Sequence, residues 1–355
     1  MKFFALLAAA MMAVSGAAGE TSRASEPQTG AKAAIVIDAA SGDVIYQKNA
    51  GERLPMASTT KIMTALIALE QEGLDEEFVV DSEAIRVEGS SMGLREGDRV
   101  TLRALAHGML LPSGNDAANA AACRIAGSVE DFVELMNGRA AEMGLKDTHF
   151  VTPSGLDDYT DEHLSTAADM AQLARTAMKN PDFREICAKK TAEVEFGDPP
   201  ERRWLTNTNR LLSMYEGTVG IKTGFTDKAG RCLVSACERD GAMLICVTLN
   251  DRSDWDDHMK LYDYGFSRLE SVKLGPEIPE YRVAVIGGRT EGVSCRGTEG
   301  SLQLLPETSA RLTRVTIIKP FIYAPVEYGD EIGRTDFYLD GELVATLPIL
   351  AQASC

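Results

Sequence analysis

The sequence has few of the residues and patterns that mark proteins binding nucleic acids or metals. Basic side chains are outnumbered, with 36 Lys and Arg against 53 Asp and Glu, so the 355-residue chain has a formal net charge of −17. Such a surface repels nucleic acid and anionic lipid headgroups. The four histidines lack metal-site spacing, and the seven cysteines contain no C-x-x-C pair. We therefore expect no metal, no cofactor and no nucleic-acid partner.

The cysteine count also bears on disulfides. An odd number cannot pair completely within the chain. Cys123, Cys232, Cys237 and Cys246 lie in apolar helical or strand patterns, where a free buried thiol is the commoner state. We expect no disulfide on which activity depends.

A long apolar run occurs only at the N-terminus. Lys2 precedes the apolar run Phe3–Val14, and small residues follow up to Ala17, which is typical of a secretory signal peptide. The run is too short for a membrane-spanning anchor, so residues 1–17 predict export with cleavage after Ala17. Residues 18–30 form a polar leader. The chain stops at 351–355 directly after a predicted strand, which argues against membrane attachment at that end.

The middle of the chain predicts an α+β domain. Its length and composition, 45% hydrophobic and 25% charged, fit a soluble globular protein of two domains. Strand patterns occur at Ala33–Asp38 and Val44–Gln47 and return between 220 and 249. Helical patterns are found at 58–69, 102–111, 116–125, 129–143, 166–178 and 255–269. Residues 31–269 therefore predict an antiparallel sheet covered by helices on both faces.

The composition and the hydrophobic pattern of the sequence change after residue 269. Turns rich in Pro, Glu and Gly separate short alternating runs. This pattern predicts a small C-terminal all-β domain, residues 270–355, that is sandwich-like and has no catalytic cluster of its own.

The first chemically informative motif is Ser58-Thr59-Thr60-Lys61, at the start of a helix predicted to be apolar on nearly every side. The spacing places the Ser58 hydroxyl and the Lys61 amine on one face, within reach of each other. A serine needs a base to take its proton, and a lysine can serve only when it is neutral. Burial and a nearby positive Lys222 would both lower the Lys61 pKa. Alternatively, Ser58 could simply cap the helix.

The second motif is Ser113-Gly114-Asn115, in a predicted turn between two helices. In isolation such a turn is most often structural. Beside a serine–lysine pair, Ser113 becomes a candidate proton relay to the leaving group. Asn115 becomes a candidate donor or acceptor for a substrate amide.

The third motif, Lys222-Thr223-Gly224-Phe225-Thr226, is expected where one strand ends before the next begins. Lys222, Thr223 and Thr226 can hold a carboxylate, and Gly224 lets a substrate approach the backbone. The Phe225 backbone N–H can join the N–H of the serine as an oxyanion donor. Alone, the segment could equally be a surface strand end.

Each motif occurs once, and the ordered trio indicates a serine acyl-transfer enzyme. A competing G-x-S-x-G match, Gly89–Gly93, lacks the preceding strand and following helix that a nucleophile elbow needs. The scattered histidines favour structural roles over a catalytic triad.

With these motifs in place, residues 31–269 resemble the serine D-alanyl-D-alanine carboxypeptidases, the low-molecular-mass penicillin-binding proteins. The surroundings of the motifs, such as Gly220–Gly230, carry the resemblance as well. The segments Ala324-Pro325-Val326 and Gly329–Gly333 are similar to the C-terminal β domain of that family.

The resemblance implies a β-lactamase/DD-peptidase-like fold and a site. Its catalytic residues would be Ser58 as nucleophile, Lys61 as its base, and Ser113 with Asn115. Substrate would be bound by Lys222, Thr223, Gly224, Phe225 and Thr226. The substrate implied is the D-Ala-D-Ala end of a peptidoglycan stem peptide outside the cytoplasm, and β-lactams would acylate Ser58. Cell-wall proteins are possible partners of the C-terminal domain.

One departure from the family pattern concerns carboxylate recognition. Many relatives carry an arginine after the last core strand, whereas this chain has Asp254-Trp255-Asp256-Asp257 there and Arg252 nearby. Two other functions stay open: a β-lactamase, although no E-x-x-x-N follows the second motif, and a non-catalytic peptidoglycan-binding or assembly protein.

Overall fold

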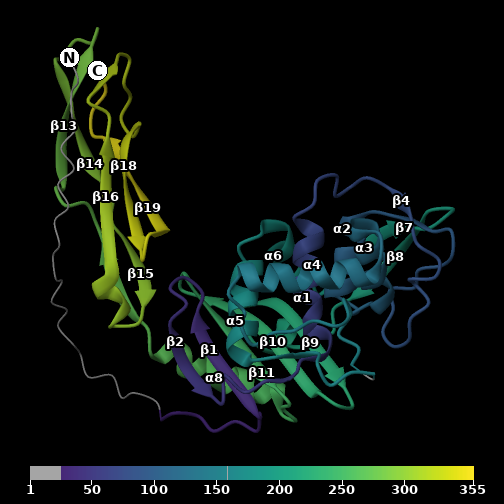
Figure 1. Ribbon diagram of the computed structural model, residues 1–355. Helices are drawn as coiled ribbons and strands as arrows, with labels where there is room; N and C mark the ends of the chain where they lie inside the picture. The colour runs from purple at the N-terminus through teal and green to yellow at the C-terminus, as the bar shows by residue number, and fades with distance from the viewer. Residues whose placement is uncertain (1–24, 158) are drawn as a thin grey trace. The chain divides into compact units, whose positions relative to one another are not determined.

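A computed structural model describes residues 25–157 and 159–355 (Figure 1). These residues form two compact units, one ending at Ser267 and the other running from Arg268 to Cys355. We call them the N-terminal unit and the C-terminal unit. The predicted signal peptide, residues 1–17, and the start of the predicted leader lie outside the described residues. No helix within the described ranges is long and apolar enough to cross a membrane.

A five-stranded antiparallel sheet forms the centre of the N-terminal unit. Strands β1 and β11 are buried almost throughout, because side chains on both of their faces are covered. The β10–β11 hairpin turns at Asp240 and Gly241, which both have positive φ, as a tight hairpin turn requires. The strand order is β2 (Val44–Lys48), β1 (Ala33–Asp38), β11 (Ala242–Leu249), β10 (Gly230–Arg239) and β9 (Thr218–Thr226).

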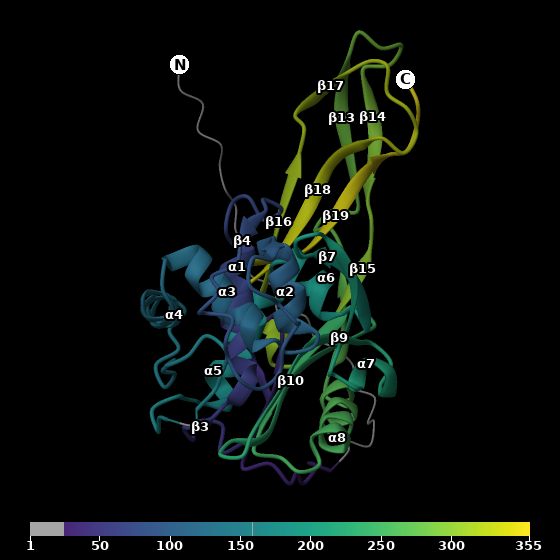
Figure 2. The same cartoon turned by 90° about the vertical axis from the view of Figure 1, so that its right-hand side faces the viewer.

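Helices cover both faces of this sheet, which confirms the predicted α+β fold. Helix α8 (Asp254–Ser267) packs on β10 and β11, and α5 (Ala167–Ala177) packs on β1 and β11. Figure 2 shows α8 and α1 (Lys61–Leu69) on opposite sides of β9 and β10. The other helices are α2 (Leu102–Leu110), α3 (Asn115–Ala126), α4 (Val129–Glu142), α6 (Pro181–Cys187) and α7 (Leu211–Met214).

Helix α1 lies inside the core of the N-terminal unit. Every one of its residues is buried, as its apolar pattern predicts. It contacts α2, α3, α5 and α6. A 3-10 turn, η1 (Ala57–Thr60), precedes it, so Ser58 lies just before the α-helix and not in its first turn.

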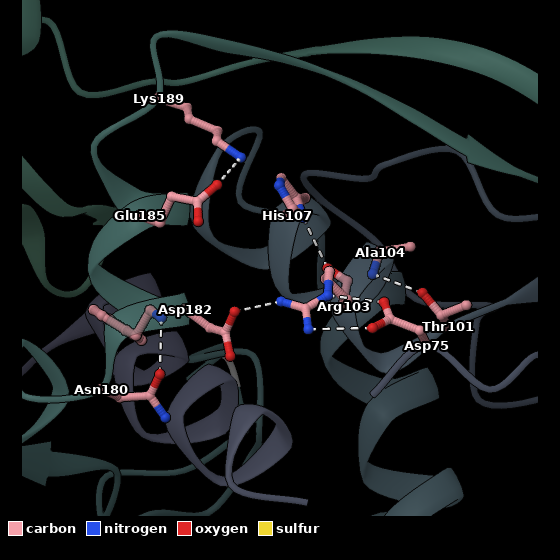
Figure 3. A network of polar contacts seen from close by, with 10 residues as sticks. Asp75, Thr101, Arg103, Ala104, His107, Asn180, Asp182, Glu185 and Lys189 are labelled. Carbon is pink, nitrogen blue, oxygen red and sulfur yellow. Dashed lines mark hydrogen bonds and ion pairs between the residues drawn. The ribbon is translucent and has the colours of Figure 1, made fainter. Parts of the chain in front are cut away.

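Side-chain bonds hold the surrounding helices in place. The Arg103 guanidinium on α2 binds Asp75 and also Asp182 at the start of α6, which ties the two helices together (Figure 3). The hydroxyl of Thr101 caps α2 by accepting the Ala104 N–H. The hydroxyl of Thr166 caps α5 by accepting the Asp169 N–H.

Sequence patterning missed several elements and misplaced one. Strand β9 does not end at Lys222, as predicted, but continues through the third motif to Thr226, because β10 pairs with it as far as Gly230. Helix α6 begins with Pro181 at its first position and was not predicted. The short strand pairs are also additional: β3 (Leu54–Pro55) with β6 (Leu164–Ser165), β4 (Phe78–Val79) with β5 (Arg99–Val100), and β7 (Thr191–Phe196) with β8 (Glu201–Thr206).

The C-terminal unit consists of strands apart from one 3-10 turn, Thr308–Arg311, in agreement with the predicted all-β character. A small core that includes Val283, Cys295 and Ile349 lies in its larger sheet. That sheet has the order β16 (Leu312–Ile318), β18 (Glu331–Leu339), β19 (Glu342–Ala351), β14 (Gly292–Gly297), β13 (Glu280–Ile286) and β17 (Phe321–Tyr323). A separate pair joins β12 (Glu270–Leu274) and β15 (Gly300–Leu304).

Candidate active site

The turn that carries Ser58 is held in an unusual backbone conformation. Ala57 has φ 48°, a value that residues other than glycine rarely adopt. Gly155, from the loop 151–157, packs directly on the Ala57–Ser58 peptide: a Cβ at Gly155 would lie 2.5 Å from the Ala57 carbonyl carbon and 2.9 Å from Ser58 N. Such strain persists only where the surrounding structure enforces it, and it is concentrated at functional sites.

Lys61 is completely buried beside Ser58. Its Nζ atom lies 3.0 Å from Ser58 Oγ and 2.6 Å from the Ser154 carbonyl oxygen. Burial lowers the Lys61 pKa well below its usual range, and the positive charge of Lys222 lowers it further. Burial and Lys222 thus lower the Lys61 pKa, as the sequence predicts.

Asn115 completes the surroundings of the amine. Its Nδ2 donates to the Glu88 carbonyl oxygen at 2.7 Å, which turns Oδ1 toward Lys61 Nζ, also at 2.7 Å. Two of the three groups around Nζ, Asn115 Oδ1 and the Ser154 carbonyl, can only accept hydrogen bonds. A neutral amine satisfies both with its two N–H bonds and directs its lone pair at the Ser58 hydroxyl. The geometry therefore suits a neutral lysine that takes a proton from serine.

Lys222 is the second buried lysine of the site. Its Nζ donates to the Thr223 carbonyl oxygen at 2.8 Å, and burial lowers its pKa to about 7. Because two positive charges in one buried region repel each other, a charged Lys222 favours a neutral Lys61.

The rest of the third motif lies on strand β9, against the 3-10 turn Ala57–Thr60, which we call the serine turn. A Cβ at Gly224 would be 3.0 Å from the Met56 carbonyl oxygen and 3.1 Å from Ser58 N, so glycine lets the strand approach closely. Thr226 Oγ1 donates to Asp157 Oδ2 at 3.0 Å. The Thr223 hydroxyl lies 2.7 Å from that of Thr208, and the Phe225 side chain is exposed.

Ser113 is placed less directly than the sequence analysis anticipated. It is buried in the turn before α3, with φ 69°. Within the described part of the chain, its hydroxyl makes no hydrogen bond to Lys61, Ser58 or Asn115. The structure thus joins Ser58, Lys61 and Asn115 in one hydrogen-bonded cluster, and the Ser113 hydroxyl is not bonded to it.

Sequence reasoning missed the residues that support this cluster. Asp116, next to Asn115, accepts the Ser91 hydroxyl at 2.6 Å and the backbone N–H groups of residues 92–94. Ser154 acts through its backbone carbonyl and Gly155 through having no side chain. Turn chemistry in Pro153-Ser154-Gly155 was the available signal, and it indicates a turn without indicating a site.

A cavity of about 530 Å³ lies against two segments that also contact the cluster. Its lining residues are Arg86, Val87, Glu88, Val151, Thr152, Leu156, Tyr159 and Thr160. Both segments also hold the site, one through the Glu88 carbonyl and the other through the Ser154 carbonyl. None of the residues Lys222–Thr226 lines it.

The competing motif does not form a nucleophile elbow. Gly89–Gly93 lies in an irregular stretch between β4 and β5, without a preceding strand of useful length or a following helix. Two histidines, His163 and His258, are buried and hydrogen-bonded to hydroxyl groups. All seven cysteines are unpaired.

Comparisons with known proteins agree with this architecture. Residues 20–253 match the family model described as D-alanyl-D-alanine carboxypeptidase, Peptidase_S11. The chain is 33% identical over 345 residues to the D-alanyl-D-alanine carboxypeptidase DacF of Bacillus subtilis, covering 93% of this chain and 87% of that protein. It is 33% identical to DacC of Escherichia coli, covering 92% and 84%.

Solved structures of related proteins have the same fold. The crystal structure of the D-alanyl-D-alanine carboxypeptidase DacD from Francisella tularensis matches with a TM-score of 0.66 at 26% identity, covering 95% of this chain and 97% of that one. The Streptomyces K15 DD-transpeptidase matches with a TM-score of 0.65 at 33% identity, covering 69% and 100%. This chain therefore belongs to the D-alanyl-D-alanine carboxypeptidase family.

Proposed function

We propose that this protein is an exported serine carboxypeptidase that removes the terminal D-alanine from peptidoglycan stem peptides through an acyl-enzyme on Ser58. The observation that carries the proposal is the placement of Lys61 Nζ, 3.0 Å from Ser58 Oγ, with its other two contacts made to oxygens that can only accept. That arrangement supports a neutral amine as the general base.

The chemistry balances as an acyl transfer followed by hydrolysis. Ser58 Oγ attacks the carbonyl carbon of the penultimate D-alanine, and its proton passes to Lys61 Nζ. The peptide C–N bond breaks, the proton reaches the leaving nitrogen, and D-alanine departs. We assign this last transfer to the Ser113 hydroxyl, which would give its own proton to the leaving nitrogen and take the proton held by Lys61. Water then cleaves the Ser58 ester and releases the shortened peptide.

Two further interactions belong to the proposal. The backbone N–H groups of Ser58 and Phe225 would stabilise the oxyanion, which is consistent with the close packing of Gly224 on Ser58 N. Lys222, Thr223 and Thr226 would hold the terminal carboxylate of the substrate. A protonated Lys222 would serve both purposes, because its charge attracts the carboxylate and keeps Lys61 neutral.

The cavity lined in part by Glu88 and Val151 would take the acyl side of the peptide. With the carboxylate at Lys222, the remainder of the chain must leave the site elsewhere, and the segments 86–88 and 151–160 offer space of about 530 Å³. β-Lactams, which mimic D-Ala-D-Ala, would acylate the same Ser58. Export rests on the signal-like residues 1–17, and binding of cell-wall proteins by the C-terminal unit is a further part of the proposal.

Two other activities can use the same acylation step. A β-lactamase hydrolyses its acyl-enzyme quickly, but the loop 151–160 contains no glutamate to activate water. A transpeptidase passes the acyl group to an amine, and one similar structure has the name DD-transpeptidase.

The test is D-alanine release from a peptide ending in Lys-D-Ala-D-Ala, measured with wild type and Ser58→Ala. Release by wild type alone is the expected result. Rapid turnover of a chromogenic cephalosporin without D-alanine release would favour the β-lactamase. Retention of all cellular functions by Ser58→Ala would favour a non-catalytic protein. Fractionation of cells expressing the full chain, with and without residues 2–17, tests export.

A further inference from the structure

His163 is a buried histidine close to the catalytic cluster that the proposed chemistry does not use. It is 1% exposed, and its ring contacts Phe150 edge to face. Its Nδ1 accepts the backbone N–H of Val151 at 2.9 Å. A backbone N–H can only donate, so the neutral imidazole must carry its own proton on Nε2. That N–H then donates to Thr60 Oγ1, 2.7 Å away.

Thr60 links His163 to the rest of the serine turn by hydrogen bonds. Its hydroxyl donates to the Ala57 carbonyl oxygen at 2.8 Å, immediately before Ser58. A continuous series of hydrogen bonds therefore runs from Val151 through His163 and Thr60 to Ala57. This is the carbonyl group on which Gly155 packs.

The loop that begins at Val151 also holds the lysine. Thr64 Oγ1 on α1 donates to the Pro153 carbonyl oxygen at 2.6 Å, and Lys61 Nζ donates to the Ser154 carbonyl oxygen at 2.6 Å. The loop is thus fixed to the serine turn and to α1 at successive points, and His163 connects its first residue, Val151, to Thr60.

We propose that His163 is a positioning residue for acylation: by bridging Val151 and Thr60, it fixes the loop 151–155 so that the Ser154 carbonyl holds Lys61 against Ser58. The inference rests on the proposed function, because it concerns the geometry of the same serine and lysine. His163 touches no reacting atom.

The charge state of His163 is consistent with a purely positional role. Burial lowers the His163 pKa to about 3, so the ring stays neutral at working pH. The charged groups that bear on Lys61 itself are Lys222 on β9 and Asp116 on α3. His163 therefore contributes hydrogen bonds of constant direction and takes no part in proton transfer.

The central variant is His163→Phe, which keeps a ring against Phe150 and removes the hydrogen bonds of the imidazole to Thr60, Val151 and Thr152. His258→Phe is the matched control. His258 is also fully buried and bonded to two hydroxyl groups, those of Ser235 and Thr248, but it lies on α8 across the sheet. Thermal unfolding curves of both variants identify a temperature at which both are folded, and the acylation rates are compared at that temperature.

The first readout is the second-order rate constant for Ser58 acylation by a fluorescent penicillin, measured against pH. We expect about a 100-fold lower rate in His163→Phe, the size of effect that small misplacements of reacting groups produce. His163→Gln, whose amide can still donate to Thr60, should recover part of the rate. His258→Phe should acylate like wild type once it is folded.

A double-mutant cycle with Thr60→Val tests the pathway of the effect. If His163 acts through Thr60, the double variant is no slower than the worse single variant. Independent effects that multiply, or equal acylation rates in folded His163→Phe and His258→Phe, would overturn the inference.

A second readout separates this inference from the proposed function. NMR titration of the Lys61 side chain needs no substrate. Loosening the loop admits water to the amine and removes part of the burial that lowers its pKa, so His163→Phe should raise the Lys61 pKa while His258→Phe leaves it unchanged. An unshifted Lys61 in His163→Phe refutes the positioning role. Absence of acylation in wild type refutes the proposed function instead.

Discussion

Replacing Gly155 by alanine tests whether its close contact with the Ala57–Ser58 peptide aligns the catalytic serine. Gly155 has φ +89°, and an added Cβ would lie 2.5 Å from the Ala57 carbonyl carbon, closer still to its oxygen, and 2.9 Å from Ser58 N. Ordinary contacts begin at 3.4 Å, so the loop and the serine turn must separate by about 1 Å. The contacting atoms belong to the backbone and cannot turn away.

The expected losses can be estimated separately for stability and rate. The left-handed φ alone costs an alanine about 1–2 kcal/mol. Overpacking adds about 1–3 kcal/mol. A separation of about 1 Å would also carry the Ser154 carbonyl away from Lys61 Nζ, which corresponds to about a 100-fold slower acylation.

Gly127→Ala is a matched control for the backbone cost. Gly127 has φ +87°, ends helix α3, and has no atom within 4 Å of an added Cβ. Urea unfolding should show Gly155→Ala to be the less stable of the two. Acylation by a fluorescent penicillin, measured where both are folded, should be slow only in Gly155→Ala. Equal acylation rates would refute the idea that this contact aligns the serine turn.

Three other predictions follow from the site and its surroundings. Acylation should fall as the pH falls through the lowered Lys61 pKa, because the protonated amine cannot act as a base. The Lys222→Gln substitution removes one cause of the lowered pKa, so in a pH–rate profile of this variant the fall should begin at higher pH. Asp116→Asn should cost about 2–3 kcal/mol in urea unfolding, because its carboxylate accepts bonds from Ser91 and from residues 92–94, and an unchanged midpoint would contradict this. Reductant should change neither the melting temperature nor D-alanine release, since all seven cysteines are unpaired, and a loss of either would reveal a disulfide.

The sequence was most informative where side-chain chemistry recurs with a fixed spacing. The Ser58–Lys61 spacing predicted the contact between hydroxyl and amine, which is present at 3.0 Å. The short apolar runs predicted strands of the central sheet, and the all-apolar pattern of α1 predicted its burial. These features are local, so a short window of residues is enough to recognise them.

Features that depend on distant pairing or on the backbone were not recognisable. Strand β9 extends through Lys222–Thr226 because β10 supplies partners, although the apolar pattern ends earlier. The Ser154 carbonyl contacts Lys61 from a loop 93 positions away, and any residue type could provide that carbonyl. His163 looked like one of several scattered histidines, because its bond to Thr60 joins residues 103 positions apart.

The most direct test of the central claim is mass spectrometry of the protein after brief incubation with benzylpenicillin, followed by proteolysis to locate the adduct. The account predicts that one penicilloyl group is attached in wild type, on the peptide that contains Ser58, and that Ser58→Ala acquires none. An adduct on another residue, or an unmodified wild-type protein that is shown to be folded, would contradict the assignment of Ser58 as the nucleophile.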